Sequence, residues 1–303
     1  MTKPSAMALH GWIILDKPVG LGSTQAVGAV KRALRDGGYG KAKVGHGGTL
    51  DPLASGVLPI AIGEATKLAG RMLDSDKAYD FTIRFGEQTD TLDAEGQVIA
   101  TSHVRPTAAA IEAVLPRFTG PIAQTPPAYS ALKIDGARAY DLARAGEEVV
   151  LASRDVIIHS LLRHRDGGVV DQVTLTAHVS KGTYIRSLAR DIALALGSVG
   201  HVTMLRRLRA GPFGLAEAIS LDKLAGAAKA RELEDILLPL RAGLDDIPAF
   251  SLTPDQAGAL RQGRVLAGID AADGATFAMY GDVPVALIDV HRGEARVVRG
   301  FNL

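Results

Sequence analysis

The segment from Tyr79 to Phe85 constrains the fold of this chain more than any other. Tyr79, Phe81, Ile83 and Phe85 stand at alternate positions and are separated by polar residues. Side chains along a β-strand point alternately to its two faces, so this pattern predicts a strand with one face in a hydrophobic core. The fold therefore contains a sheet.

The other apolar segments predict a mixture of strands and helices. Further strands are predicted at residues 12–16, 57–62, 154–164, 169–180 and 201–209. The third and fourth of these are expected to pair around the turn-forming sequence Asp166-Gly167-Gly168. Apolar residues at helical spacing predict helices, the first of them capped by Ser23, at residues 26–34, 64–73, 108–115 and 183–196. Residues 37–49, which are rich in glycine and basic residues and have no periodicity, are expected to form a loop. Residues 121–127, which contain three prolines, are expected to be extended.

The character of the sequence changes after Leu240, which predicts two domains, residues 1–243 and 244–303. A linker is expected at residues 243–248. The second domain is then predicted to begin with a short helix at residues 254–262, capped by Thr253. Short strands follow near residues 276–280, 285–290 and 295–299. A β-rich unit of this size is near the lower limit for an independent core.

Composition and motifs exclude several classes of function. The chain has no cysteine, which rules out disulfides, thiolate zinc sites and a cysteine nucleophile. No apolar run reaches 18 residues and the first ten residues lack an export signal, so no membrane association is expected and a cytoplasmic location fits. Gly20-Leu21-Gly22 lacks the third glycine of a dinucleotide site. The spacing of Asp90, Asp93 and Glu95 does not match a calcium loop, and the histidines are scattered, so no metal site is predicted.

Positive charge is concentrated in two separate parts of the chain, although the net charge is only +1. Residues 1–50 contain seven Lys or Arg against two Asp, a balance of +5, and residues 181–210 contain six against one, also +5. If the two segments met in space, they would form a face that binds a polyanion. A pair of solvated surfaces is the alternative that charge alone leaves open.

A glycine-rich loop at residues 44–56 carries one His and one Asp to the start of a buried strand. Pro52 fixes the backbone next to Asp51 and biases Asp51 towards an extended conformation. A carboxylate held in this way at the rim of a core is well placed for nucleophilic or base chemistry. From these features alone, an Asp-Pro turn on a surface loop remains an alternative.

Residues 45–59, with the sequence GHGGTLDPLASGVLP, strongly resemble the catalytic motif of the tRNA pseudouridine-55 synthase (TruB) family. The resemblance continues, in the family's order, through the blocks LDKP (15–18), GEATK (63–67), DSDKAY (74–79), GEQTDTLD (86–93), QTPPAYSALK (124–133), SKGTYIRSL (180–188) and HVTMLRR (201–207). Two departures are visible. Gly47 stands where many relatives have threonine, and Thr49 where some have alanine, but both flank the catalytic position without replacing it.

This resemblance implies both a fold and a reaction. The fold is α+β, with a mixed, largely antiparallel central sheet flanked by helices, and a small β-rich C-terminal domain similar to the PUA RNA-binding barrel. Only residues 260–264 carry that second similarity. The reaction is the isomerisation of uridine at position 55, in the T-loop of tRNA, in which the N1–C1′ bond is broken and C5 is joined to C1′. No redox partner, cofactor or metal is implied.

Three residues match the family's catalytic group. Asp51 matches the essential carboxylate, which either attacks C1′ or removes a sugar proton. Arg186 matches the arginine that pairs with it, because a guanidinium can hold a carboxylate in its charged form. Tyr79 matches a tyrosine whose ring can stack on the base and whose hydroxyl could assist a proton transfer. A surface cation and a core aromatic are the plainer interpretations of Arg186 and Tyr79.

Other matched residues are expected to bind the RNA. His46 matches the histidine that takes the place of the displaced uridine in its stack. Tyr184 and Leu205 match residues that line the base pocket, and either could instead be core. Contacts to RNA phosphates are predicted for the basic residues Lys17, Lys67, Lys133, Lys181, Arg206 and Arg207. Lys17 could equally be structural, because it adjoins a tight Pro-Gly turn.

The expected partner is the T-arm stem-loop of tRNA, and the expected state is a monomer with no obligatory protein partner. Two alternatives remain open. A guide-RNA-dependent synthase of the dyskerin-like branch would share the core motifs but would need a larger C-terminal region. An RNA-binding chaperone that folds tRNA would not need Asp51, Tyr79 and Arg186 to be intact.

Overall fold

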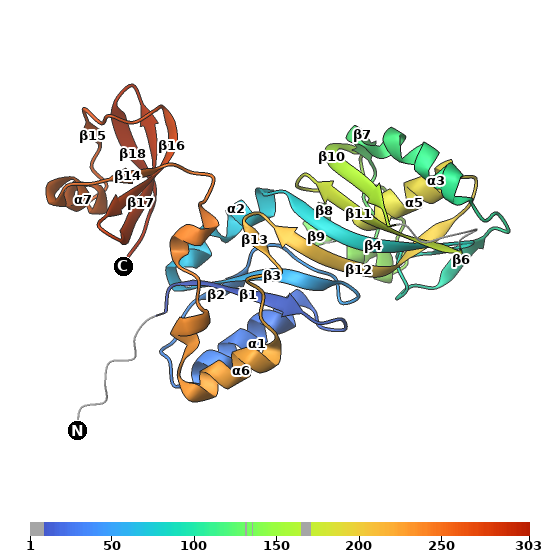
Figure 1. Cartoon of the computed structure of the whole chain (residues 1–303), viewed down its shortest axis with the longest axis horizontal. Helices are drawn as coiled ribbons and strands as arrows, with labels where there is room; N and C mark the ends of the chain where they lie inside the picture. The colour runs from blue at the N-terminus through green and yellow to red at the C-terminus, as the bar shows by residue number, and fades with distance from the viewer. Residues whose placement is uncertain (1–8, 131, 135, 165–170) are drawn as a thin grey trace.

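The computed structural model of the chain describes residues 9–130, 132–134, 136–164 and 171–303. Its centre is a mixed sheet (Figure 1), in which the strands follow the order β1 (Gly11–Lys17), β3 (Ser55–Ile62), β12 (Gly200–Ala210), β4 (Lys77–Phe85), β11 (Gln172–Val179), β10 (Arg154–Arg163) and β7 (Gly120–Gln124). Two short strands pair beside this path, β2 (Val44–His46) with β3 and β13 (Phe213–Gly214) with β12. β3 and β12 run parallel, whereas all the other neighbours are antiparallel. The predicted α+β fold is therefore confirmed.

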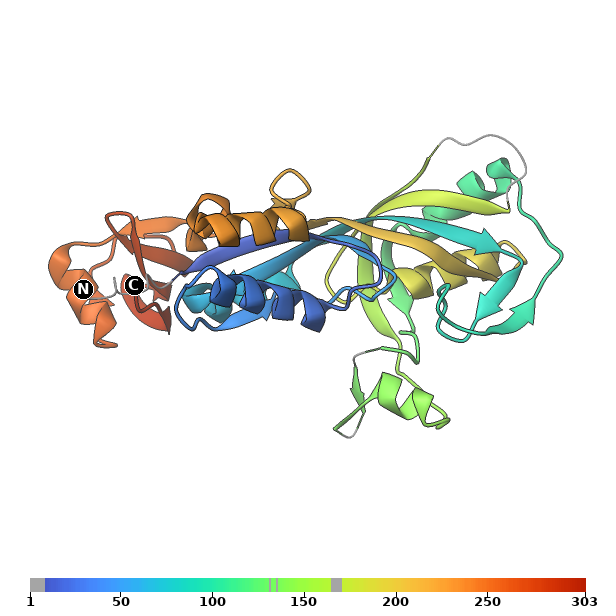
Figure 2. The ribbon, with the colours of Figure 1, turned by 90° about the horizontal axis from the view of Figure 1, so that it is seen from below.

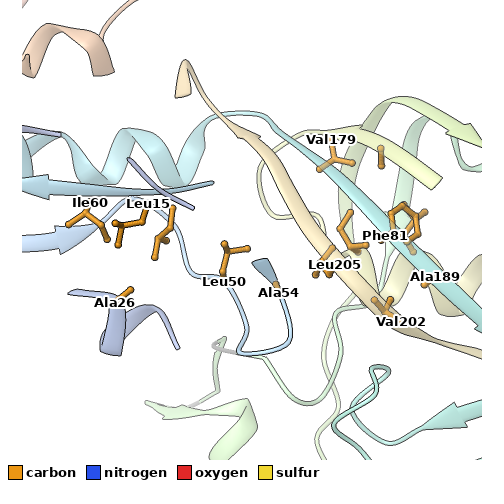
Figure 3. Packing of buried hydrophobic residues seen from close by; sticks show 14 of the residues in the cluster. Leu15, Ala26, Leu50, Ala54, Ile60, Phe81, Val179, Ala189, Val202 and Leu205 are labelled. Atoms are coloured by element: carbon orange, nitrogen blue, oxygen red, sulfur yellow. The ribbon is translucent and has the colours of Figure 1, made fainter. Parts of the chain in front are cut away.

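Helices flank the two halves of this sheet. Next to the β1–β3 half, α1 (Ser23–Asp36) lies side by side with α6 (Leu221–Ala230). At the other half, α5 (Ile185–Ala195) packs on β12 and β4, and α3 (Ala108–Val114) lies near β7 and β10 in Figure 1. One hydrophobic cluster runs through both halves, and in Figure 3 Leu50 and Ala54 lie between its two parts. The loop that carries Asp51 is thus anchored where the halves of the core meet.

Three local predictions for the first 75 residues are corrected. Residues 37–49 are not wholly a loop, because Val44–His46 pairs with β3 as strand β2. The helix expected at residues 64–73 is a 3-10 turn, Gly63–Leu68, followed by α2 (Ala69–Asp74). Ser23 does not cap α1, since Gly22 occupies the cap position. The Ser23 hydroxyl donates to Leu50 O at 2.9 Å and accepts from Leu50 N–H at 2.8 Å, which ties the helix to the loop that carries Asp51.

The outer segments include one predicted hairpin and two short ones. β10 and β11 pair antiparallel as predicted, while the turn Asp166-Gly167-Gly168 lies outside the described residues. β5 (Glu87–Thr89) pairs with β6 (Val98–Thr101). β8 (Lys133–Ile134), β9 (Ala137–Arg138) and α4 (Ala139–Arg144) form a small unit that projects from the sheet in Figure 2.

The C-terminal part is a second, smaller β structure, as predicted. Its five strands follow the order β14 (Ala249–Ser251), β16 (Gly274–Tyr280), β17 (Val283–His291), β18 (Glu294–Gly300) and β15 (Leu266–Ala267). The Thr253 side chain caps α7 (Pro254–Arg261) by accepting from Gln256 N–H.

The segment expected to be a linker is packed rather than free. Leu244 and Ile247 are buried in one cluster that joins Trp12 of β1 to Phe277 and Phe301 of the C-terminal sheet. This shared core holds the C-terminal domain against the sheet. No helix in the described part of the chain has the length and apolarity that a membrane crossing requires.

Candidate active site

Asp51 lies on a loop whose backbone is fixed on both sides. Leu50 and Ala54 are buried, and Asp51 O accepts a hydrogen bond from Ala54 N–H at 3.0 Å. Gly20 N–H donates to Pro52 O at 2.8 Å, which attaches the loop to the turn after β1. The Asp51 side chain itself remains 40% exposed. A rigid backbone thus presents a carboxylate that a substrate can reach.

Arg186, in the first turn of α5, places its guanidinium beside this carboxylate. Arg186 Nη2 lies 2.9 Å from Asp51 Oδ2, which is the contact that the family resemblance implies. The same guanidinium donates to Thr91 O at 2.7 Å and to Tyr129 O at 2.9 Å, and its side chain is only 8% exposed. Backbone carbonyls from two other segments therefore set the position of the cation that meets Asp51.

A second carboxylate at this guanidinium escaped the sequence analysis. Asp93 Oδ2 lies 3.4 Å from Arg186 Nη1, and its side chain is only 4% exposed. Asp93 Oδ1 accepts from Thr91 Oγ1 at 2.6 Å and from Glu95 N–H at 3.1 Å. Arg186 therefore lies between Asp51 and Asp93. The spacing of Asp90, Asp93 and Glu95 in the sequence gave no sign that Asp93 is the member that turns inward.

For the activity that the resemblance implies, we expect Asp93→Asn to lower kcat by about 10- to 100-fold while RNA affinity changes less than about threefold. Without the second carboxylate the Arg186 guanidinium can shift, and small displacements of a catalytic group cost rates of this order. Steady-state kinetics and filter binding would measure the two effects. Asp36→Asn, which removes an exposed carboxylate at the end of α1, is the matched control. Equal losses in both variants would contradict a specific role for Asp93.

The aromatic and apolar residues predicted for the base pocket come from adjacent elements. Tyr79 on β4 and Leu205 on β12 pack against the same core cluster, and Tyr79 is half-buried. Tyr184 precedes α5, and its N–H donates to the Gln124 side chain at 2.8 Å. The guanidinium carbon of Arg154 lies 4.8 Å from the centre of the Tyr184 ring. Two of these elements are also connected to Asp51. Helix α5 carries Arg186, the ion-pair partner of Asp51, and β12 pairs with β3, which follows the Asp51 loop.

His46 ends β2, opposite Ile60 of β3. Its Nδ1 atom is buried and has no hydrogen-bond partner within the described residues. Burial, and then the charge of Arg207, lower the pKa of His46 below its ordinary value of 6.5. The ring is therefore neutral at pH 7 and has the character of a planar, largely apolar group.

Two of the predicted phosphate contacts are wrong, because Lys17 and Arg207 are buried. Lys17 Nζ donates to Leu21 O at 2.6 Å and to Pro18 O at 3.0 Å, and burial lowers its pKa to about 8. Within the described residues, the Arg207 guanidinium donates only to backbone carbonyls, those of Gly48 and Thr49 in the Asp51 loop and of Val57 in β3. In both cases the sequence indicated a cation but not whether its side chain points into the protein or to the solvent.

The remaining four cations are accessible to different degrees. Arg206 forms a two-pronged ion pair with Asp16, at 2.8 and 3.0 Å, that joins the two basic segments. Lys67 bonds Glu64 at 2.6 Å and Gly300 O at 2.8 Å, across to the C-terminal domain. Lys181 is an exposed partner of Asp74, and Lys133 is exposed on β8. The basic segments do meet, but several of their charges serve internal contacts rather than a free surface.

The site contains no evident metal cage. Across the described residues, no group of three or more His, Cys, Asp or Glu side chains could hold a metal ion.

Comparisons with known proteins agree on one family. The family model described as TruB family pseudouridylate synthase (N terminal domain) matches residues 36–185, and that of the tRNA pseudouridylate synthase B C-terminal domain matches residues 186–245. The tRNA pseudouridine synthase B of Novosphingobium aromaticivorans is 64% identical over 298 residues, covering 97% of this chain and 98% of that protein. The protein of the same name from Zymomonas mobilis is 61% identical over 302 residues, covering 100% and 99%.

Solved structures with the same fold are more distant in sequence. An H/ACA RNP bound to a substrate RNA containing 2′-deoxyuridine has a chain that is 25% identical, with a TM-score of 0.72, covering 97% of this chain and 85% of its own. A chain of the archaeal box H/ACA sRNP Nop10-Cbf5 complex is 26% identical, with a TM-score of 0.71, covering 96% and 86%.

Proposed function

This chain belongs to the TruB family of pseudouridylate synthases, and on that premise we propose that it converts uridine 55 in the T-loop of tRNA into pseudouridine. The observation that supports this most directly is the position of Asp51. Its carboxylate is exposed, its backbone is fixed, and a buried guanidinium lies 2.9 Å away. The relatives that are 61–64% identical along their whole length carry the name tRNA pseudouridine synthase B.

In the proposed reaction Asp51 acts on the ribose as an ionised carboxylate. It either attacks C1′ as the N1–C1′ bond breaks, or removes a sugar proton to give a glycal. The freed uracil anion then turns, and C5 bonds to C1′ while the Asp51–C1′ bond breaks or, in the glycal route, while Asp51 returns the sugar proton. The C5 proton then leaves and N1 gains a proton, so the isomerisation balances without an external reactant. Arg186 pairs with the Asp51 carboxylate and fixes its direction.

The surrounding residues would hold the base out of its stack. Tyr79 would stack on the uracil, with Tyr184 and Leu205 completing the pocket. The neutral ring of His46 would occupy the space that the uridine leaves in the T-loop. A ring whose pKa is lowered by burial suits this role, since stacking needs a planar face and no charge.

Stand-alone action on tRNA is favoured over the guide-RNA-dependent alternative. The relatives named tRNA pseudouridine synthase B are 47–64% identical, whereas the chains from H/ACA complexes are 25–26% identical. We therefore propose a monomer that needs no protein partner or cofactor and works in the cytoplasm. An additional chaperone activity is compatible with the same RNA-binding surface, but the intact Asp51–Arg186 pair argues against a chaperone alone.

The proposal is tested with purified protein and two transcripts, an unmodified tRNA and its isolated T-arm stem-loop. We expect pseudouridine at the same single position in both, because the enzyme needs only a loop whose shape presents the target base. Pseudouridine mapping gives the position, and transcripts with cytidine there are the control. Modification of whole tRNA alone would contradict local recognition, and no modification of either would contradict the proposed function.

A further inference from the structure

The guanidinium of Arg207 is buried among backbone carbonyls. Its residue is 1% exposed, and no carboxylate in the described part of the chain lies within ion-pair distance of it. Burying a charge without an opposite charge is costly unless hydrogen bonds compensate. Because of this cost, we expect the Arg207 cation to have a role, such as hydrogen bonding to backbone carbonyls, that an apolar side chain in the same place could not fill.

Its hydrogen bonds reach both arms of the catalytic loop. Arg207 Nη2 donates to Gly48 O at 3.1 Å and Nη1 to Thr49 O at 3.3 Å, on the arm that precedes Asp51. Arg207 Nε donates to Val57 O at 2.7 Å, on the arm that follows. The planar fork of an arginine offers donors in several fixed directions, whereas a lysine offers a single point charge. One side chain therefore clasps the segment from Gly48 to Val57.

The backbone of Arg207 also contacts this segment. Gly56 pairs with Arg207 in the parallel register between β3 and β12. A Cβ atom at Gly56 would lie 2.2 Å from Arg207 O, and the Gly56 φ of +100° is one that other residues rarely adopt. On its other side, Arg207 is the register partner of Tyr79 on β4. Arg207 thus stands between the Asp51 loop and the strand of the proposed base-stacking tyrosine.

We infer that Arg207 is a positioning residue of the isomerase, which holds the catalytic loop by clasping both of its arms and so fixes Asp51 relative to Tyr79. This inference rests on the proposed function. It replaces the phosphate contact that the sequence predicted for Arg207 with a role inside the protein. The positive charge that lowers the pKa of His46 is a second consequence of the same placement.

The test compares Arg207→Met with Arg209→Met, which removes an exposed arginine from the same strand. We expect Arg207→Met to lower kcat by at least about 100-fold, because a loop that is no longer clasped misplaces Asp51. KM, and the slope of tRNA affinity against salt, should change little, since no phosphate contact is lost. Hydrogen exchange of amides in residues 48–57 should accelerate at least tenfold, and the pKa of His46, followed by NMR, should rise. Arg209→Met should show none of these effects.

Arg207→Lys keeps the inference testable if the methionine variant does not fold. It retains the charge but cannot reach three carbonyls, so we expect faster exchange in residues 48–57 and a kcat at least tenfold lower, with an unchanged circular dichroism spectrum. A kcat within threefold of the wild type, or unchanged exchange in the loop, would overturn the inference. A tenfold loss of tRNA affinity, together with a weaker dependence of that affinity on salt concentration, would overturn the inference and would instead support a phosphate contact by Arg207. If the wild type itself does not isomerise uridine, the proposed function fails, while loop exchange still reports on the clasp.

Discussion

Replacing Asp51 with asparagine should abolish isomerisation, with kcat lower by roughly 10³-fold or more and the Kd for tRNA within about twofold. Asparagine keeps the shape of the side chain and can still accept a hydrogen bond from Arg186. It lacks the negative charge, which is needed whether Asp51 attacks C1′ or removes a proton. The loop should not move, because Leu50, Ala54 and the Gly20–Pro52 hydrogen bond hold it independently of the carboxylate.

Single-turnover kinetics and filter binding on the same preparation separate chemistry from affinity. Asp36→Asn, on the exposed end of α1, is the matched control because it removes a carboxylate of the same kind far from the catalytic loop. Residual turnover of Asp51→Asn above a few per cent of the wild type would rule out Asp51 as the essential group. Loss of binding in parallel with loss of turnover would instead indicate that the variant has lost the shape of its RNA site.

Removing residues 244–303 should destabilise the catalytic domain, with a loss on the order of 5 kcal/mol in the free energy of unfolding. The deletion takes away Phe277, Met279, Leu287 and Phe301, which share one buried cluster with residues of β1, β3 and α2. That loss is a large part of the stability of a typical domain. Thermal unfolding followed by circular dichroism should show a Tm lower by about 10 °C or more.

A pair of point variants isolates the contribution of packing. Phe301→Ala removes a buried ring and should lower Tm clearly, whereas Val298→Ala, on the exposed side of β18, should not. At a temperature where the truncated protein is folded, KM should rise more than kcat falls, because the catalytic groups all lie before residue 208. An unchanged Tm after truncation would show that the shared cluster contributes little.

The family resemblance predicted the pairing of Asp51 with Arg186, because both residues stand within sequence blocks that match the family in order. The resemblance could not predict that Arg207 is buried while Arg206 is partly exposed. Adjacent residues on a strand face opposite sides, so one arginine pairs with Asp16 near the surface and the other is enclosed by the catalytic loop. Only the pairing of β12 with β3 and β4 decides which of the two turns inward.

Two other predictions, for Ser23 and for residues 243–248, were also wrong because of tertiary contacts. Ser23 has the residue type and position of a helix cap, yet its hydroxyl bonds Leu50, which is 27 residues away in sequence. The segment 243–248 is rich in the residues of a linker, yet Leu244 and Ile247 enter a core that two domains share. Local patterns predicted the longer strands and most helices but missed short strands such as β2, β5 and β6. These contacts depend on distant segments that no local pattern includes.

The clasp between Arg207 and Val57 has a consequence for how the protein is made. The two residues are 150 positions apart in the chain, so a ribosome that has synthesised the catalytic loop must add the whole intervening sequence before the loop can be fixed. At about 5 to 20 residues per second this takes roughly 8 to 30 s. During that interval the nascent chain carries Asp51 on a loop without its inner support, and tRNA-modifying activity begins only after β12 has joined the sheet.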